Sequence, residues 1–196
     1  MKASRTKSDT RQKIIDKALE LFYRQGYLAT GINQVIAESG VAKNTFYYYF
    51  PSKNDLCVSY LQEIDRNWIN SIKTTINSSK KPLDRLFAPL EFLKKWNEDN
   101  AYRGCPFLNI VSEITDSSSN IRKETIYHKD GFKTIIRELV KDLKESNKKY
   151  FDTDVESVTD AYYLLAEGAI VTSQNYKDNL SFKVARNNIE KLLNPS

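Results

Sequence analysis

The chain has 196 residues, of which 40% are hydrophobic and 28% are charged, and its formal net charge is +5. This is the composition of an ordinary soluble globular protein, and the chain has neither an apolar run of about 18 residues that would span a membrane nor the apolar core of a secretory signal. His128 is the only histidine, which excludes a histidine metal cluster and disfavours a Ser-His-Asp triad, so we expect no metal and no cofactor.

Helical periodicity dominates the first part of the chain. Apolar residues within 14–22 recur on one face and predict a first helix that ends at Gly26. A shorter second helix carries its apolar face within residues 32–36 and ends at Gly40. A third begins near residue 42 and ends before Pro51.

The rest of the chain is helical as well. Ser52 followed by Asp55 forms a capping-box pattern, so a long fourth helix is expected to begin there. After the polar break at residues 78–82, periodicity predicts helices at about 83–99, 105–117, 120–146, 154–176 and 181–193. No segment shows sustained period-two alternation, so the predicted fold is all-α with about nine helices.

The first three predicted helices also carry the charge excess. Residues 1–53 hold nine Lys/Arg and four Asp/Glu, whereas the rest of the chain holds 21 of each. This asymmetry favours a polyanion as the partner of the first quarter of the chain. A solubilising basic N-terminus is the alternative.

The segment GVAKNTFYYYF, residues 40–50, has the form of the second half of a helix-turn-helix, in which two short helices flank a glycine-containing turn. Successive residues of a helix are 100° apart, so Phe46 and Phe50 fall on one side and are expected to anchor the helix. Tyr49 lies at the edge of this anchoring side, and the opposite side presents Lys43, Asn44, Thr45, Tyr47 and Tyr48.

The polar residues on that side suit the major groove of DNA. Lysine donates to guanine edges or phosphates, asparagine pairs with adenine, and threonine offers a hydroxyl and a methyl group. Tyrosine hydroxyls donate to phosphate oxygens and fix the register on the duplex. The alternative is that the tyrosines are half-buried in an ordinary helix surface.

The order and spacing of these residues resemble the N-terminal domain of the TetR family of bacterial transcriptional repressors, over about 50 residues from Arg11 onward. The residues that meet the family pattern are Ala37, Gly40, Val41, Lys43, Thr45, Phe46, Tyr47, Phe50 and Lys53. Asn44 replaces the usual glycine and Pro51 stands at an often basic position, so some DNA contacts are expected to differ. The resemblance implies phosphate contacts for Thr30 and Lys53, while a basic arm at residues 2–7 would add non-specific affinity.

The resemblance also implies a division of labour. Residues 1–53 would form the DNA-binding domain, and residues 54–196 a helical domain that binds a small molecule and forms a homodimer. Such a protein would be a cytoplasmic repressor, independent of membranes, that an inducer of unknown identity releases from double-stranded operator DNA.

Small residues within 158–174 favour close helix packing, and with the last helix they are expected to form an intermolecular four-helix bundle. The predicted dimer interface comprises Ala161, Leu165, Gly168, Ala169, Thr172, Ile189 and Leu192. The alternative is that both helices pack within one chain.

Aromatic residues are numerous enough to line an apolar ligand cavity, although most aromatic residues at helical spacing belong to the core. The candidates are Trp68, Trp96, Tyr102, Phe107, Tyr127, Phe132, Tyr162 and Tyr163. Glu113 and Asp116 are candidates to bind a cationic ligand, or are solvated helix residues.

The segment RGCPFLN, residues 103–109, contains one of the two cysteines. Pro106 suits a first helical turn, so Cys105 is expected at the helix N-cap, where the helix dipole and Arg103 would favour the thiolate. The segment is similar to the Gly-Cys segment of electrophile- and aldehyde-responsive TetR members. Cys105 is therefore a candidate reactive or ligand-contacting thiol; the alternative is that Cys105, like Cys57, is an inert reduced thiol of a cytosolic protein.

The leading hypothesis is a homodimeric, ligand-responsive DNA-binding repressor. An all-helical enzyme acting through Cys105 or a carboxylate pair is a second class, but no catalytic motif supports it. A helical adaptor whose basic head binds RNA or acidic proteins is a third.

Overall fold

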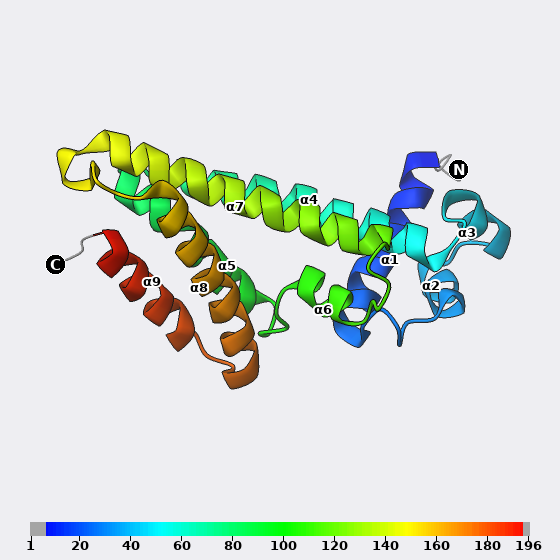
Figure 1. The fold of residues 1–196 in the computed structure, drawn as a ribbon. Helices are drawn as coiled ribbons and strands as arrows, with labels where there is room; N and C mark the ends of the chain where they lie inside the picture. The colour runs from blue at the N-terminus through cyan, green and yellow to red at the C-terminus, as the bar shows by residue number, and fades with distance from the viewer. Residues whose placement is uncertain (1–6, 194–196) are drawn as a thin grey trace. The chain divides into compact units, whose positions relative to one another are not determined.

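The computed structural model describes residues 7–193, and within that range all regular secondary structure is helical (Figure 1). Its elements are α1 (Lys7–Gln25), α2 (Ile32–Ser39), α3 (Lys43–Tyr49), α4 (Lys53–Asn77), α5 (Pro82–Asp99), α6 (Pro106–Ser112), α7 (Asn120–Ser146), the 3-10 helix η1 (Lys148–Tyr150), α8 (Val155–Tyr176) and α9 (Leu180–Leu193). The all-α prediction is confirmed. No helix in this range has the length and hydrophobicity needed to cross a bilayer. Apart from Lys7, the predicted basic arm lies outside the described residues.

One helix is clearly shorter than predicted. We expected a helix over 105–117, but α6 ends at Ser112. The chain then turns through residues 113–119, where the Asp116 carboxylate accepts hydrogen bonds from the backbone N–H and the hydroxyl of Ser118, both at 2.8 Å. Such local side-chain bonds compete with the helical ladder, and a periodicity count does not register them.

The helices pack as two compact units. The first contains α1 to α3, α4 as far as Asp65, and Pro106–Ile126; the second contains Arg66–Cys105 and the chain from Tyr127 onward. This division differs from the predicted boundary after residue 53 because α4 runs unbroken past that point and because α6 packs against α1.

The first unit is organised by the buried stripe of α1. Ile14, Ile15 and Ala18 are fully buried, as the periodicity predicted, and Phe22 meets the Tyr60 ring edge-on with centroids 5.4 Å apart. These contacts give α1 a continuous apolar seam against which the shorter helices pack.

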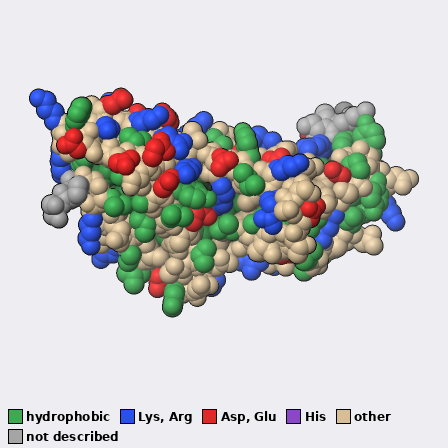
Figure 2. All heavy atoms as spheres, in the orientation of Figure 1, with side chains coloured by type: hydrophobic (Ala, Val, Ile, Leu, Met, Phe, Trp, Pro, Cys, Tyr) green, Lys and Arg blue, Asp and Glu red, His purple; other side chains and the backbone are tan. Residues whose placement is uncertain are grey.

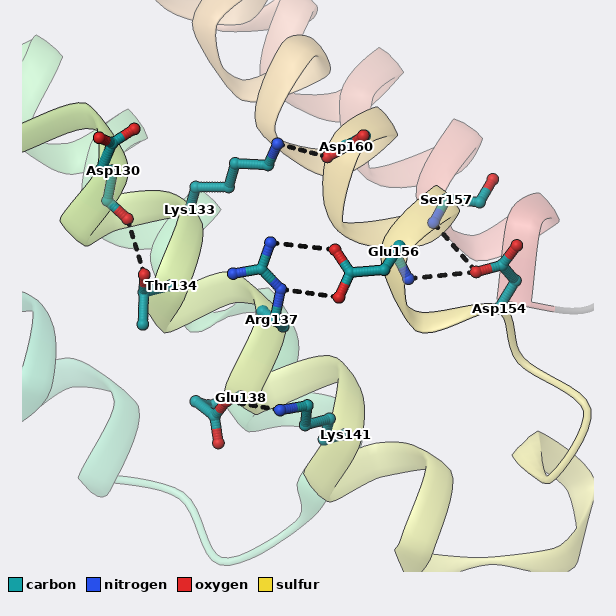
Figure 3. A network of polar contacts seen from close by, with 10 residues as sticks. All are labelled: Asp130, Lys133, Thr134, Arg137, Glu138, Lys141, Asp154, Glu156, Ser157 and Asp160. Atoms are coloured by element: carbon teal, nitrogen blue, oxygen red, sulfur yellow. Dashed lines mark hydrogen bonds and ion pairs between the residues drawn. The ribbon is translucent and has the colours of Figure 1, made fainter. Parts of the chain in front are cut away.

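In the second unit, α5, α8 and α9 pack against one another. Tyr162 of α8 is fully buried and its hydroxyl donates to the Leu86 carbonyl at 2.9 Å. Exposed ion pairs link α7 to α8, with Arg137 bidentate to Glu156 at 2.8 and 3.0 Å and Lys133 at 2.6 Å from Asp160 (Figure 3).

Candidate nucleic-acid interface and sensor site

Helices α2 and α3 form the predicted helix-turn-helix. Gly40 ends α2 in the left-handed conformation, with φ +66°, and its N–H donates to the Ala37 carbonyl. This backbone region favours glycine, which explains the residue at the turn. Val35 is buried on the inner side of α2. Glu38, near the end of the same helix, lies 3.7 Å from Lys17 of α1.

Helix α3 has two chemically distinct sides. Phe46 and Phe50 are 0% and 2% exposed, and their rings lie 6.0 Å apart between centroids. The Arg11 guanidinium of α1 lies 5.2 Å from the Phe50 ring and donates to the Ser59 hydroxyl of α4 at 3.0 Å. The predicted anchoring role of the two phenylalanines is therefore confirmed, and Arg11 is an additional anchor that periodicity did not identify.

The other side of α3 is open to solvent. Tyr47 and Tyr48 are 40% and 68% exposed, and Lys43 and Asn44 are exposed as well. Thr45 and Tyr49 are half-buried, and the Tyr49 ring meets Tyr48 edge-on at 5.0 Å. An α-helix with its side chains has a diameter of about 10–12 Å, which fits a major groove about 12 Å wide.

Two predicted phosphate contacts look different in the structure. Thr30 is fully buried, and its hydroxyl donates to the Gly26 carbonyl at 2.7 Å, so this side chain is not available to a phosphate. The prediction for Thr30 is corrected accordingly: its hydroxyl fixes the turn before α2. Lys53 is half-buried, with Nζ 4.3 Å from the Tyr27 ring centroid and 3.4 Å from the Leu28 carbonyl. Burial lowers the pKa of Lys53, while Cys57 and Glu113 act in the opposite direction.

The predicted dimer residues are distributed over both sides of α8 and α9. Ala169 and Ile189 are buried within the chain, Ala161 and Leu165 are half-buried, and the rest are exposed: Gly168, Thr172 and Leu192. A groove of about 440 Å³ between the two helices is lined by residues that include Leu165, Gly168, Ala169 and Thr172.

The same groove exposes the aliphatic side chains of Leu164, Leu180 and Val184. Of these, only Val184 had been expected at the predicted interface, as part of the last helix. Figure 2 shows hydrophobic side chains gathered at the surface over α8 and α9. These residues extend the apolar pattern onto the outer side of the helices, so the spacing of apolar residues in the sequence could have identified them.

Three of the predicted ligand-site residues, Trp68, Phe132 and Tyr163, belong to one cluster of contacting rings in the second unit. The Trp68 ring meets His128, Phe92 and Phe132 edge-on at 4.8, 5.7 and 5.2 Å, and Phe132 meets Tyr163 at 6.2 Å. Burial, followed by the Glu167 carboxylate, raises the pKa of Tyr163.

Cys105 lies in a charged cluster with Lys129 and Glu167. Lys129 Nζ is 3.5 Å from the buried Cys105 Sγ and 2.7 and 2.8 Å from the two carboxylate oxygens of Glu167. Burial by itself would lower the pKa of Lys129, but Cys105 and Glu167 outweigh it, so the pKa is raised. The Cys105 sulfur therefore lies beside an ammonium group that is itself paired with a carboxylate.

The remaining predicted ligand residues lie elsewhere. Trp96 is half-buried in α5, and Tyr102 is in the loop after it with φ +54°. Phe107 is buried in the first unit. Tyr127 is 67% exposed, so the prediction that it lines a buried pocket is corrected.

Glu113 is predicted as a ligand residue, and its carboxylate already has partners within the chain. Its two oxygens accept the backbone N–H groups of Tyr27 and Leu28, at 3.1 and 2.6 Å. The two partners are 86 and 85 positions away in the sequence, and no local pattern indicates this contact.

Comparison with protein families covers both parts of the chain. Residues 14–59 match bacterial regulatory proteins of the tetR family, and residues 82–189 match the tetracyclin repressor-like C-terminal domain. The first match contains the helix-turn-helix, and the second runs from α5 into α9.

Two curated relatives are similar over more than half of this chain. An HTH-type transcriptional regulator in the lacX 3' region of Lactococcus lactis subsp. lactis is 31% identical over 117 residues, which cover 59% of this chain and 60% of that protein. The HTH-type transcriptional regulator LmrA of Bacillus subtilis (strain 168) is 31% identical over 117 residues, covering 59% of this chain and 62% of LmrA. The chain thus spans less than two thirds of the length of these relatives.

Solved structures match over nearly the whole chain. A TetR-family transcriptional regulator from Streptomyces coelicolor has a TM-score of 0.81 at 24% identity over 95% of both chains. The reduced form of NemR from E. coli has a TM-score of 0.81 at 19% identity, covering 94% of this chain and 97% of NemR. At these identities the likeness is one of fold.

Proposed function

The chain belongs to the TetR family of bacterial regulatory proteins, and we propose that it is a sequence-specific DNA-binding regulator that represses transcription in the cytoplasm until a small molecule releases it from operator DNA. The observation that carries this proposal is the two-sided construction of α3. Phe46 and Phe50 hold the helix from inside, while Lys43, Asn44 and Tyr47 face solvent with groups suited to bases and phosphates.

Each exposed residue of α3 has a role in this proposal. Asn44 reads a base edge, and Lys43 contacts a guanine or a phosphate. Tyr47 and Tyr48 donate to phosphate oxygens, with half-buried Thr45 and Tyr49 supporting them, and Lys53 adds a phosphate contact at the start of α4. Gly31, the N-cap of α2, has no side-chain hydrogen bond to that helix, which leaves its first N–H groups for a phosphate.

The direct test is binding to the DNA upstream of the chain's own coding region, measured at two salt concentrations. Sequence-selective binding that weakens steeply with salt supports a DNA-binding regulator. A variant with Lys43→Ala and Tyr47→Phe should lose this binding while keeping its helical content and melting temperature. Equal binding by that variant and its parent would refute the assignment of the reading side.

A homodimer is part of the proposal because two reading heads on one duplex lie about 34 Å apart or a multiple of that distance. The support is the groove on α8 and α9, whose exposed Leu164, Leu180 and Val184 would be covered by the same helices of a second copy. Gly168, which has no side chain, would let the α8 backbone approach the helices of the second copy closely.

Release from DNA requires a ligand that binds the DNA-free conformation better than the DNA-bound one. We assign the ligand to the region of Trp68, Phe132 and Tyr163, where aromatic faces and a tyrosine hydroxyl suit a mostly apolar molecule. A screen for small molecules that weaken DNA binding, with Tyr163→Phe and Trp68→Leu variants, tests this assignment.

A second, more specific possibility is that the signal is an electrophile that reacts with Cys105. The observation that favours it is the ammonium group of Lys129, 3.5 Å from the Cys105 sulfur. Cys57 provides an internal comparison, because burial raises the pKa of its thiol far above the ordinary value. Alkylation of the folded protein near neutral pH should label Cys105 first; labelling of Cys105 no faster than a free model thiol would exclude this role.

Family membership weighs against the enzyme alternative, because the matched families and relatives are transcriptional regulators. An adaptor that binds RNA or acidic proteins would bind duplex DNA without sequence preference. Competition between operator and random DNA distinguishes it from the regulator.

A further inference from the structure

We infer that Glu113, directly after α6, is a positioning residue for the DNA-reading helices. Its carboxylate holds the turn between α1 and α2, and loss of this contact weakens DNA binding without any change in the residues that touch DNA. The inference rests on the proposed function, since it assigns a role in DNA binding.

The contact is a carboxylate that accepts two consecutive backbone N–H groups. Glu113 Oε1 lies 3.1 Å from Tyr27 N, and Oε2 lies 2.6 Å from Leu28 N. We call Glu113 with these two amides the Glu113 clamp. Charge-assisted bonds of this kind are shorter and stronger than neutral ones, and here they engage both oxygens at once.

The chain at Gly26 is shaped to let the carboxylate approach. Gly26 ends α1 with φ +97°, and a Cβ atom added there would lie only 2.9 Å from Glu113 Oε1. Both the backbone conformation and the space therefore favour glycine at this position. The carboxylate thus fits closely against a bare stretch of backbone, which restricts where the turn can lie.

The clamped turn leads directly into the reading helices. Thr30 is buried and its hydroxyl donates to the Gly26 carbonyl at 2.7 Å, so the turn closes on itself just before α2 begins at Ile32. Because α3 follows α2 after three residues, the direction of this turn fixes where both helices project from α1.

The same turn also positions a proposed phosphate contact. The Tyr27 hydroxyl donates to the Asn54 side chain, and Lys53 Nζ lies over the Tyr27 ring and near the Leu28 carbonyl. The Glu113 clamp therefore orders one face of the turn while the start of α4 orders the other. Releasing Glu113 would loosen α2, α3 and Lys53 together.

The test compares Glu113→Gln with Glu145→Gln. Both substitutions remove one negative charge, but Glu145 is exposed near the end of α7, in the second unit. A glutamine at 113 can accept only one of the two N–H groups and turns its own NH₂ toward the other. We expect DNA affinity to fall about tenfold for Glu113→Gln and to be unchanged or slightly higher for Glu145→Gln.

The sign of this effect separates positioning from general electrostatics. Removing an acid from a protein that binds polyanionic DNA should by itself strengthen binding, so weaker binding by Glu113→Gln cannot come from net charge. Amide hydrogen exchange of the free protein gives an independent readout, because the Tyr27 and Leu28 N–H groups should exchange faster in Glu113→Gln and not in Glu145→Gln.

The outcomes are distinct. If the parent binds operator DNA selectively and Glu113→Gln binds equally well, the positioning role is wrong and the proposed function stands. If the parent shows no selectivity for its upstream DNA, the proposed function fails and this inference fails with it. Should Glu113→Gln not fold, Glu113→Asp keeps the charge but shortens the reach, and it too should exchange faster and bind more weakly; parental behaviour would overturn the clamp.

Discussion

Helix α3 and the helices α8 and α9 differ in what they leave exposed. Helix α3 turns two phenylalanine rings inward and leaves lysine, asparagine and tyrosine outside. Helices α8 and α9 also bury rings, such as Tyr162 and Phe182, but they leave the aliphatic side chains of Leu164 and Val184 outside.

This difference indicates what each surface meets. Exposed groups that donate and accept hydrogen bonds keep favourable contacts with water and can exchange them for contacts with DNA. Exposed aliphatic groups around a groove gain free energy only when another apolar surface covers them, and in the proposed dimer a second copy of the same helices supplies that surface. Four predictions test this comparison.

The largest effect is expected inside α3. Phe46→Ala removes a fully buried ring and should lower the free energy of unfolding by about 3–5 kcal/mol. Tyr48→Ala, on the exposed side of the same helix, should change it by less than about 0.5 kcal/mol while still weakening DNA binding. Urea unfolding of both variants measures the difference, and similar losses would mean that α3 does not have an inner and an outer side.

The next effect concerns α8 and α9. Leu164→Glu combined with Val184→Glu places two carboxylates in the apolar groove and should convert a dimer into monomers. DNA affinity should then fall at least about 100-fold, because the second half-site is no longer bound within one complex. Sedimentation velocity measures the assembly, and Phe151→Glu, at an exposed position outside the groove, is the matched control. A double variant that stays dimeric would assign this surface to another partner.

Smaller effects are expected from two substitutions that distinguish a base contact from a phosphate contact in the proposed DNA-binding surface. Asn44→Ala should cost about 1–3 kcal/mol of discrimination at one base pair and leave the salt dependence unchanged. Lys53→Ala should weaken binding to all sequences and reduce the salt slope by about one. A panel of single-base operator variants at two salt concentrations distinguishes the two patterns. Loss of selectivity in the Lys53 variant alone would reverse the roles.

The smallest effect is expected for the exposed ion pair between α7 and α8 (Figure 3). The hydrogen bond from Arg137 lowers the pKa of Glu156, so any stability from this pair is present above the ordinary glutamate pKa and is lost as the pH falls through the lowered value. Arg137→Gln should barely change the melting temperature at pH 7, since exposed pairs contribute little. Melting at neutral and acidic pH checks the sign: a difference between variant and parent that grows on acidification would contradict it.

Much of the fold followed from local pattern. The apolar stripes of α1 and α3, the glycine that ends α2 and the start of α4 are all encoded by residues within one or two helical turns of each other. Phe46 and Phe50 were assigned to the core, and are buried there, because side chains four positions apart share one face of a helix.

The corrected residues share a different property, because their partners are distant in sequence or belong to the backbone. Thr30 looked like a polar residue at a helix start, but its hydroxyl is used by the turn behind it. Tyr127 was expected in an aromatic cavity and is nevertheless exposed on α7.

The sequence by itself determined that this protein is all-helical, where most helices begin and end, and which side of α3 is buried and which is exposed, because helical periodicity is a local property of the chain. Only the tertiary structure decided that α6 stops at Ser112, that Glu113 holds the turn between α1 and α2, and that Lys129 lies beside Cys105. Hydrogen bonds between residues far apart in the chain depend on how whole helices pack, and neither composition nor spacing records that packing.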